Sequence, residues 1–174
     1  MPFDVVPPEL DEPEALVPGL AARSLAEALA YFKAATVAGR VEGTPILAAD
    51  TLVALHGRVL GKPADADEAR RMLGSLSGTR HAVITGVALL CPAGRRIASE
   101  VTHVTMRPMS EAETEEYVES GEWDGKAGAY AIQETADRFV ERVEGSFSNV
   151  VGLPMALLER ILRRYVPGAW PEGH

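Results

Sequence analysis

The stretch from Ile46 to Leu55, "ILAADTLVAL", is apolar except where it carries a carboxylate and a hydroxyl, Asp50 and Thr51. A charge inside a buried apolar strand is costly unless it is paired, hydrogen-bonded or bound to a metal. One interpretation places Asp50 at the end of a strand, where it caps a turn. The other places it at the mouth of a cleft, where it orients a water, acts as a base or holds a divalent cation. Spacing alone favours the two equally.

Lysine is the rarer basic residue in this chain. Only three of the 17 basic residues are lysine, namely Lys33, Lys62 and Lys126. Lysine presents a compact ammonium to a phosphate oxygen, whereas arginine presents a broad fork of donors. Two of the three follow glycine, in "GKP" and "GKAG". A phosphate-binding cleft would explain this pattern, and so would chance.

Common phosphate, metal and nucleophile motifs are absent. Both "GEWDGKA" and "GRVLGKP" have three residues between their glycines and lack the Ser or Thr that follows the lysine of a P-loop. The four histidines lack the spacing of metal ligands, so we expect them at the surface or in turns. Ser146 and Ser148 have no histidine nearby in the sequence. We expect them in a loop that bonds its own backbone.

Composition limits the class of protein. A chain of 174 residues that is 47% hydrophobic suits one domain with a real core. The net charge of −8 argues against a general nucleic-acid surface. The single cysteine, Cys91, permits no internal disulfide, and no stretch approaches the ~18 apolar residues of a membrane helix. The N-terminal residues lack the pattern of a signal peptide, so a soluble cytoplasmic protein is expected.

Alternating helix and strand patterns must position these residues. Hydrophobic periodicity predicts strands at 3–7, 45–55, 80–91, 97–107 and 139–145, with a turn at 56–58. Start and stop residues predict helices from Ser24 to Gly39, from Asp65 or Asp67 to Gly78, from Ser110 to Ser120 with a Glu113 capping box, and from Pro154. A glycine-rich loop at 121–130 and an irregular tail at 166–174 complete the chain. The pattern indicates one α/β domain over 1–174.

Four separate motifs resemble the Maf family of nucleoside triphosphate pyrophosphatases. They are "AADTLVALHGRVLGKP", "DGKAGAYAIQ", "FVERVEGSFSNVVGLP" and the "DE" at 11–12, and they occur in the family's order. The resemblance extends from Phe3 to about Leu162. It implies a Maf/ITPase-like α/β fold, with an elongated mixed β-sheet, flanking helices and a deep groove between two lobes.

The resemblance also implies an activity. Members cleave a nucleoside triphosphate between the α and β phosphates, with Mg²⁺ or Mn²⁺, and members are often homodimers. By motif, Asp50 resembles the proton acceptor and Glu12 a second active-site carboxylate, and both are tentative metal ligands. The three phosphate-facing cations would be Lys33, Lys62 and Lys126. Thr51 and Gln133 match positions tied to substrate choice, and "ADT" with "IQ" is similar to the branch acting on dTTP and UTP. The partner is therefore expected to be a nucleotide, with no nucleic acid or membrane.

Two departures from the family pattern leave a second reading open. The family begins with a strand and a Ser-x-Ser-Pro-Arg-Arg phosphate loop, and here Met1 falls after that unit. Glu134 occupies a position where glycine is usual. The alternative is therefore a nucleotide-binding or regulatory homologue with weak or no turnover. An interaction domain that binds no nucleotide is the third possibility.

Overall fold

The structure, a computed structural model, describes residues 3–8, 20–41, 43–133 and 135–170. Its elements follow along the chain as α1 (Ala22–Ala38), β1 (Ile46–Leu55), β2 (Arg58–Leu60), α2 (Ala66–Leu76), β3 (Arg80–Cys91), β4 (Gly94–Met106), α3 (Glu111–Ser120), η1 (Ala127–Ala129), η2 (Thr135–Phe139), β5 (Val140–Glu144), α4 (Phe147–Val151) and α5 (Met155–Tyr165). Glu12 and Glu134, which the sequence singled out, lie outside the described residues. No helix within these ranges is long and apolar enough to cross a membrane.

The five described strands form one sheet in the order β2-β1-β3-β4-β5. Its centre is the long hairpin of β3 and β4, which confirms the hairpin expected from the sequence. The second strand starts at Gly94 rather than at residue 97, because Pro92 and Ala93 alone make the turn.

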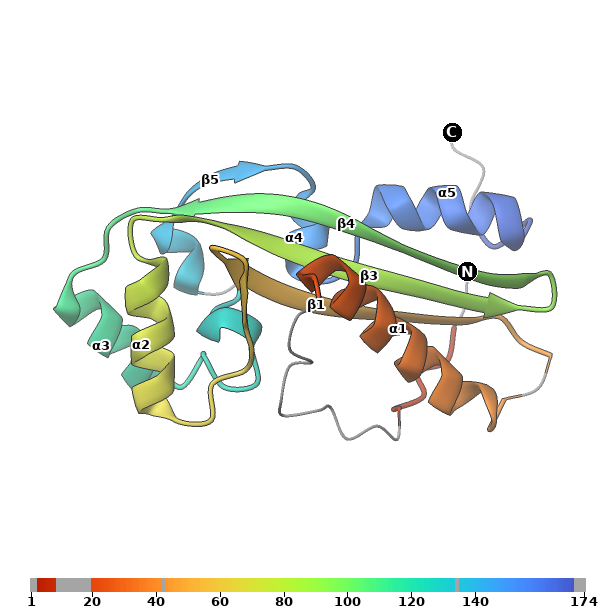
Figure 1. Ribbon diagram of the computed structural model, residues 1–174, viewed down its shortest axis with the longest axis horizontal. Coiled ribbons are helices and arrows are strands. Elements are labelled where there is room, and N and C mark those ends of the chain that lie inside the picture. Colours follow the sequence, from red (N-terminus) through yellow and green to blue (C-terminus); the bar gives the residue numbers. More distant parts are fainter. Residues whose placement is uncertain (1–2, 9–19, 42, 134, 171–174) are drawn as a thin grey trace.

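The α/β class, with an elongated sheet and flanking helices, is confirmed (Figure 1). All described strand pairs are antiparallel, however, so the expectation of mixed strand directions is wrong for these strands. Hairpins join β1 to β2 and β3 to β4, and strands joined by a hairpin run in opposite directions.

Alternate residues of β3 face different helices. Val87 and Leu89 pack against the apolar face of α5, whereas Ala88 packs against Ala30 and Ala34 of α1. This alternation follows from the two-residue repeat of a strand, and it places α1 and α5 on opposite faces of the sheet (Figure 1).

Small residues bring α1 unusually close to the sheet. A Cβ atom added to Gly86 of β3 would lie 2.2 Å from the carbonyl oxygen of Ala26 in α1. Ala26, Ala30 and Ala34 have no exposed surface. A larger side chain at Gly86 would push the helix away, so the position of α1 depends on this glycine.

A second core lies at the other end of the sheet, where α2 and α3 gather (Figure 1). It is formed by buried side chains of α2, α3, β4 and η2, including Leu73, Leu76, Met106, Tyr117 and Phe139. The rings of Tyr117 and Phe139 meet edge to face with centroids 5.8 Å apart. Both ends of the elongated sheet are therefore packed against helices.

Most helix boundaries agree with the sequence signals. Asp65 caps α2 by accepting a hydrogen bond from the backbone N–H of Glu68. Ser110 and Glu113 form the expected capping box of α3. Pro154 immediately precedes α5, as predicted. Local hydrogen bonding decides these ends, so they are readable from short motifs.

Three local predictions are wrong. Residues 3–7 form no strand: Phe3 and Val5 are 77% and 81% exposed, and Pro7 and Pro8 offer no N–H to a sheet. Helix α1 begins at Ala22 without a side-chain cap, so Ser24 lies inside it. Residues 147–151 form the short helix α4 rather than a loop, although Ser146 does bond local backbone, as expected, by accepting from Asn149 N.

Candidate active site

One part of β1 has a neighbouring strand on one side only. Strand β3 pairs with β1 from Ile46 to Ala54, whereas β2 pairs only with Val53 to Leu55. Among the described strands, residues 46–52 therefore form an outer edge of the sheet. A cavity of about 330 Å³ includes Ala49, Asp50 and Thr51 of this edge in its wall.

This cavity brings together side chains that are far apart in the chain. Six of the seven residues selected from the sequence line it: Lys33, Asp50, Thr51, Lys62, Lys126 and Gln133. They come from α1, from β1 and from the segments that follow β2 and α3. The seventh, Glu12, lies outside the described residues.

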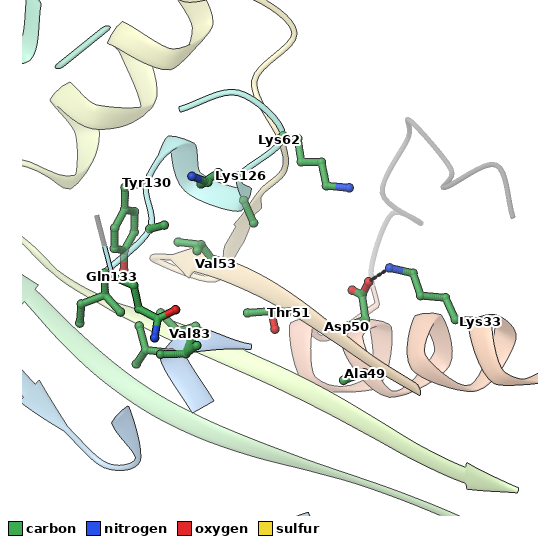
Figure 2. A pocket seen from close by; sticks show the side chains of 16 residues that line it. Lys33, Ala49, Asp50, Thr51, Val53, Lys62, Val83, Lys126, Tyr130 and Gln133 are labelled. Carbon is green, nitrogen blue, oxygen red and sulfur yellow. Dashed lines mark hydrogen bonds and ion pairs between the residues drawn. The ribbon is translucent and has the colours of Figure 1, made fainter. Parts of the chain in front are cut away.

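Asp50 forms an ion pair with Lys33. The Lys33 Nζ lies 2.5 Å from Asp50 Oδ1, and the two side chains are only 18% and 9% exposed (Figure 2). Asp50 lies within β1, so the interpretation of this residue as a turn cap at a strand end is wrong. A carboxylate this buried needs an ionic or hydrogen-bonding partner, and α1 supplies one.

Two loops bring the other lysines to the cavity. The backbone N–H of Gly128, just after Lys126, donates to the carbonyl of Gly61, just before Lys62, at 2.9 Å. Gly128 has a φ of +70°, and a Cβ there would lie 3.0 Å from Val53. The glycines of "GKAG" therefore serve close packing and loop geometry, and this bond fixes the two lysine-bearing segments together.

The labelled side chains of the cavity divide into two groups, called here the charged end and the neutral end, and Lys126 lies between Lys62 and Tyr130 (Figure 2). Lys33, Asp50 and Lys62 gather at the first. Val83, Tyr130 and Gln133 lie at the second, and Thr51 lies between the two ends. An anionic group fits the charged end, and a flat, partly apolar ring with polar edges fits the neutral end.

Tyr130 rests on a buried histidine. His81 is 2% exposed, and its Nε2 lies 2.6 Å from the Tyr130 hydroxyl. The expectation that the histidines lie at the surface or in turns is wrong for His81, because its position in β3 faces the core. Burial, and to a lesser extent the charge of His103, lower the His81 pKa to about 4. Burial also raises the pKa of Tyr130. Both side chains are therefore neutral near pH 7.

Sequence reasoning missed the supports of this site. Tyr130 and His81 stand far apart in the chain, and so do Thr85 and Asn149, which lie beneath Thr51. The fully buried Asn149 lies in "EGSFSNVVG", a motif that the sequence did point to. The asparagine that directly precedes Val150 and Val151 is the signal that could have indicated a buried hydrogen-bonding role, but the sequence reasoning did not use it.

Few of the described side chains that line the cavity are of a type that binds metal ions. Asp50 is the only carboxylate among the described residues that line the cavity. Within the described ranges, no three His, Cys, Asp or Glu side chains gather as a metal site would require. At this cavity the described residues therefore offer one carboxylate rather than a cluster of acidic ligands.

Comparison with known proteins agrees with the motifs. Residues 1–165 match the family described as Maf-like protein. The dTTP/UTP pyrophosphatase of Pelotomaculum thermopropionicum is 48% identical over 149 residues, 84% of this chain and 78% of that protein. The dTTP/UTP pyrophosphatase of Carboxydothermus hydrogenoformans is 45% identical over 165 residues, 94% and 87% of the two chains. That of Cupriavidus metallidurans is 53% identical over 119 residues, 68% and 60% of the two chains. The chain therefore belongs to the Maf family.

Proposed function

We propose that this protein hydrolyses a nucleoside triphosphate to the monophosphate and pyrophosphate, with dTTP and UTP as its preferred substrates. The observation that carries the proposal is the meeting of Lys33, Lys62, Lys126 and Asp50 at one cavity. The names of relatives that are 45% to 53% identical support the substrate class.

Asp50 acts as the general base in this proposal. Attack on phosphorus needs a positioned water that loses a proton as the new P–O bond forms. The carboxylate of Asp50 accepts that proton. Lys33 holds Oδ1 at 2.5 Å and so fixes the orientation of the carboxylate. Proton transfer depends on such alignment, because the base must lie within hydrogen-bonding reach of the water.

The lysines stabilise the phosphates. Charge grows on the departing pyrophosphate as its bond to the α phosphorus breaks, and fixed ammonium groups stabilise that charge best where water is partly excluded. The Gly128–Gly61 bond joins the two segments that carry Lys62 and Lys126, so these segments need little rearrangement. We therefore expect the two lysines to speed the cleavage step itself, and not only to tighten substrate binding.

The neutral end of the cavity receives the nucleobase of the substrate. The Gln133 side-chain amide has both donor and acceptor groups, as the edge of a pyrimidine requires. Tyr130 and Val83 provide apolar surface for the ring. Thr51 adds one hydroxyl between the neutral end and the charged end.

A divalent cation, Mg²⁺ or Mn²⁺, is part of the proposal. Magnesium is usually held by one or two carboxylates together with substrate phosphates, and the single described carboxylate of this cavity fits that pattern. Asp50 would hold the cation, with Glu12 as a second ligand. The cation supplies positive charge to the phosphate oxygens and lowers the pKa of water.

Two further expectations belong to the proposal, a homodimer and a cytoplasmic location. The family resemblance supports the first. The second is supported by the single cysteine, Cys91, because proteins of reducing compartments rarely depend on disulfides. Light scattering of the purified chain tests the dimer, and cell fractionation tests the location.

Pyrophosphate release from a panel of triphosphates, each with Mg²⁺ or Mn²⁺, tests the function. We expect dTTP and UTP to be cleaved fastest, with a monophosphate and pyrophosphate formed in equal amounts. Orthophosphate as the first product would contradict cleavage at the α–β bond. Nucleotide binding in calorimetry without product release would instead support the regulatory reading.

A further inference from the structure

Beneath the cavity, a chain of hydrogen bonds runs from Thr51 into the core. Thr51 and Thr85 are directly paired across β1 and β3, and their hydroxyl oxygens lie 2.9 Å apart. The Thr85 hydroxyl also donates to the backbone carbonyl of Asn149 at 2.9 Å. Thr85 is completely buried, so solvent does not compete for these bonds.

Asn149, the last residue in this series of hydrogen bonds, is held firmly in place. Its side-chain amide donates to the carbonyl of Val83 and to the hydroxyl of Thr102, both at 3.0 Å. Its own carbonyl also accepts from the backbone N–H of Gly152 at 3.1 Å. A carbonyl can only accept, so the direction of the Thr85 bond is set by Asn149.

The proton count then decides the direction of the first bond. A threonine hydroxyl has one proton, and Thr85 gives its proton to Asn149. The bond between the two hydroxyls is therefore donated by Thr51. With its proton committed to the core, Thr51 presents lone pairs to the cavity that it lines.

We propose that Thr85 and the carbonyl of Asn149 are positioning groups that make Thr51 a hydrogen-bond acceptor, so that the cavity selects a base that donates at this point. Uracil and thymine donate there through their ring N3–H, whereas N3 of cytosine is an acceptor. This inference rests on the proposed function, because it assumes that a nucleobase bound at the neutral end reaches Thr51. It explains a preference for uracil and thymine by residues that do not touch them.

The preference for uracil and thymine over cytosine follows from the cost of reversing the direction of these hydrogen bonds. To donate to cytosine N3, Thr51 would have to withdraw its proton from Thr85. Either one buried bond is lost, or Thr85 turns its proton away from Asn149. The loss of one net hydrogen bond corresponds to a factor of about tenfold.

Thr85→Val tests this directly. Valine has the shape of threonine without the hydroxyl, and Asn149 keeps its bond from Gly152, so the fold should survive. Freed from Thr85, the Thr51 hydroxyl can donate or accept. We expect the ratio of kcat/KM for UTP over CTP to fall about tenfold. Thr85→Ser keeps the hydroxyl and is the matched control, with the wild-type ratio expected.

A second variant and a binding measurement complete the test. Thr51→Val should lower kcat/KM for UTP about tenfold with little effect on CTP, and it does not depend on the folding of Thr85→Val. Equilibrium binding of UMP and CMP reports the same preference without turnover. A shifted UMP to CMP ratio without catalysis would refute the proposed function and support the inference. An unchanged ratio in Thr85→Val, or equal losses for both nucleotides in Thr51→Val, would overturn the inference.

Discussion

The Lys33 Nζ lies 2.5 Å from the Asp50 Oδ1, although one residue belongs to a helix and the other to the edge of a sheet. This contact joins α1 to β1 at the charged end of the cavity. It depends on a helix that sits close to the sheet, and that closeness depends in turn on Gly86. The packing of α1 is thus connected, through this pair, to the carboxylate that we propose as the general base.

Asp50→Asn should remove the proposed general base and keep the fold. The amide is of nearly the same size but accepts a proton poorly, so we expect kcat to fall by about 10²- to 10⁴-fold. Stopped pyrophosphate assays on purified protein measure this. Asp137→Asn, an exposed carboxylate outside the cavity, is the control and should keep wild-type kcat. Full kcat in Asp50→Asn would refute the assigned role.

Lys33→Met should act through Asp50 as well as through the phosphates. It removes the ammonium while retaining much of the side-chain length, and a bond to a charged group contributes about 1.5–3 kcal/mol. We therefore expect kcat/KM to drop by about 10- to 100-fold. Lys33→Arg keeps the charge but changes its shape, so partial activity is expected. If Lys33→Met and Asp50→Asn act independently, the fold-losses in rate multiply in the double variant. If Lys33 acts through Asp50, as proposed, the loss in the double variant is smaller than that product.

Gly86→Ala should move α1. The added methyl would meet the Ala26 carbonyl at 2.2 Å, so the helix must shift. We expect a loss of about 1–3 kcal/mol in the free energy of unfolding, with a lower kcat because Lys33 moves with the helix. Urea denaturation measures the first. Gly74→Ala is the matched control: nothing lies within 4 Å of its Cβ, and an alanine inside α2 should stabilise by about 0.5–1 kcal/mol.

Lys62→Ala and Lys126→Ala should weaken the grip on the phosphates. Both side chains line the cavity, so removal of either charge should raise the inhibition constant of added pyrophosphate and lower kcat. Each effect should shrink as salt is added, because ions screen partly exposed charges. Arginine at either position restores the charge and should recover part of the binding. Equal pyrophosphate inhibition of wild type and both alanine variants would contradict the assignment.

Buried His81 should make the fold sensitive to acid. Its pKa is about 4 in the folded protein and about 6.5 when unfolded, so between these values the unfolded chain binds the extra proton. Stability from this residue therefore rises with pH across that window, and about 3 kcal/mol is lost by pH 4. The Glu113 pKa is lowered from 4.5 to about 2, mainly by Arg107, so the stability that this carboxylate contributes is lost as the pH falls from about 4.5 to 2, mostly below the His81 window.

The His81 prediction is checked by urea midpoints measured from pH 4 to pH 7. His81→Gln should show a flatter dependence than the wild type, because glutamine does not titrate. Other groups contribute equally to both proteins and cancel in the difference. Parallel curves for the two proteins would show that His81 takes up its proton without cost in the folded state.

Local signals in the sequence determined much of this protein. The hairpin of β3 and β4, the capping box at Ser110 and the helix after Pro154 each depend on residues close together in the chain. The choice of cavity residues also came from the sequence, through rare lysines, a carboxylate in an apolar strand and a set of family motifs. Hydrogen bonds and periodicity act over a few residues, so such features are readable without a fold.

Only the tertiary structure decided how these parts meet. It put Asp50 beside Lys33 at the edge strand, buried His81 beneath Tyr130, and placed Thr85 between Thr51 and Asn149. Each contact joins residues between 17 and 64 positions apart. Their existence depends on the order of strands and on how closely helices pack, which no short motif specifies, because many chain segments compete to cover the same apolar surface.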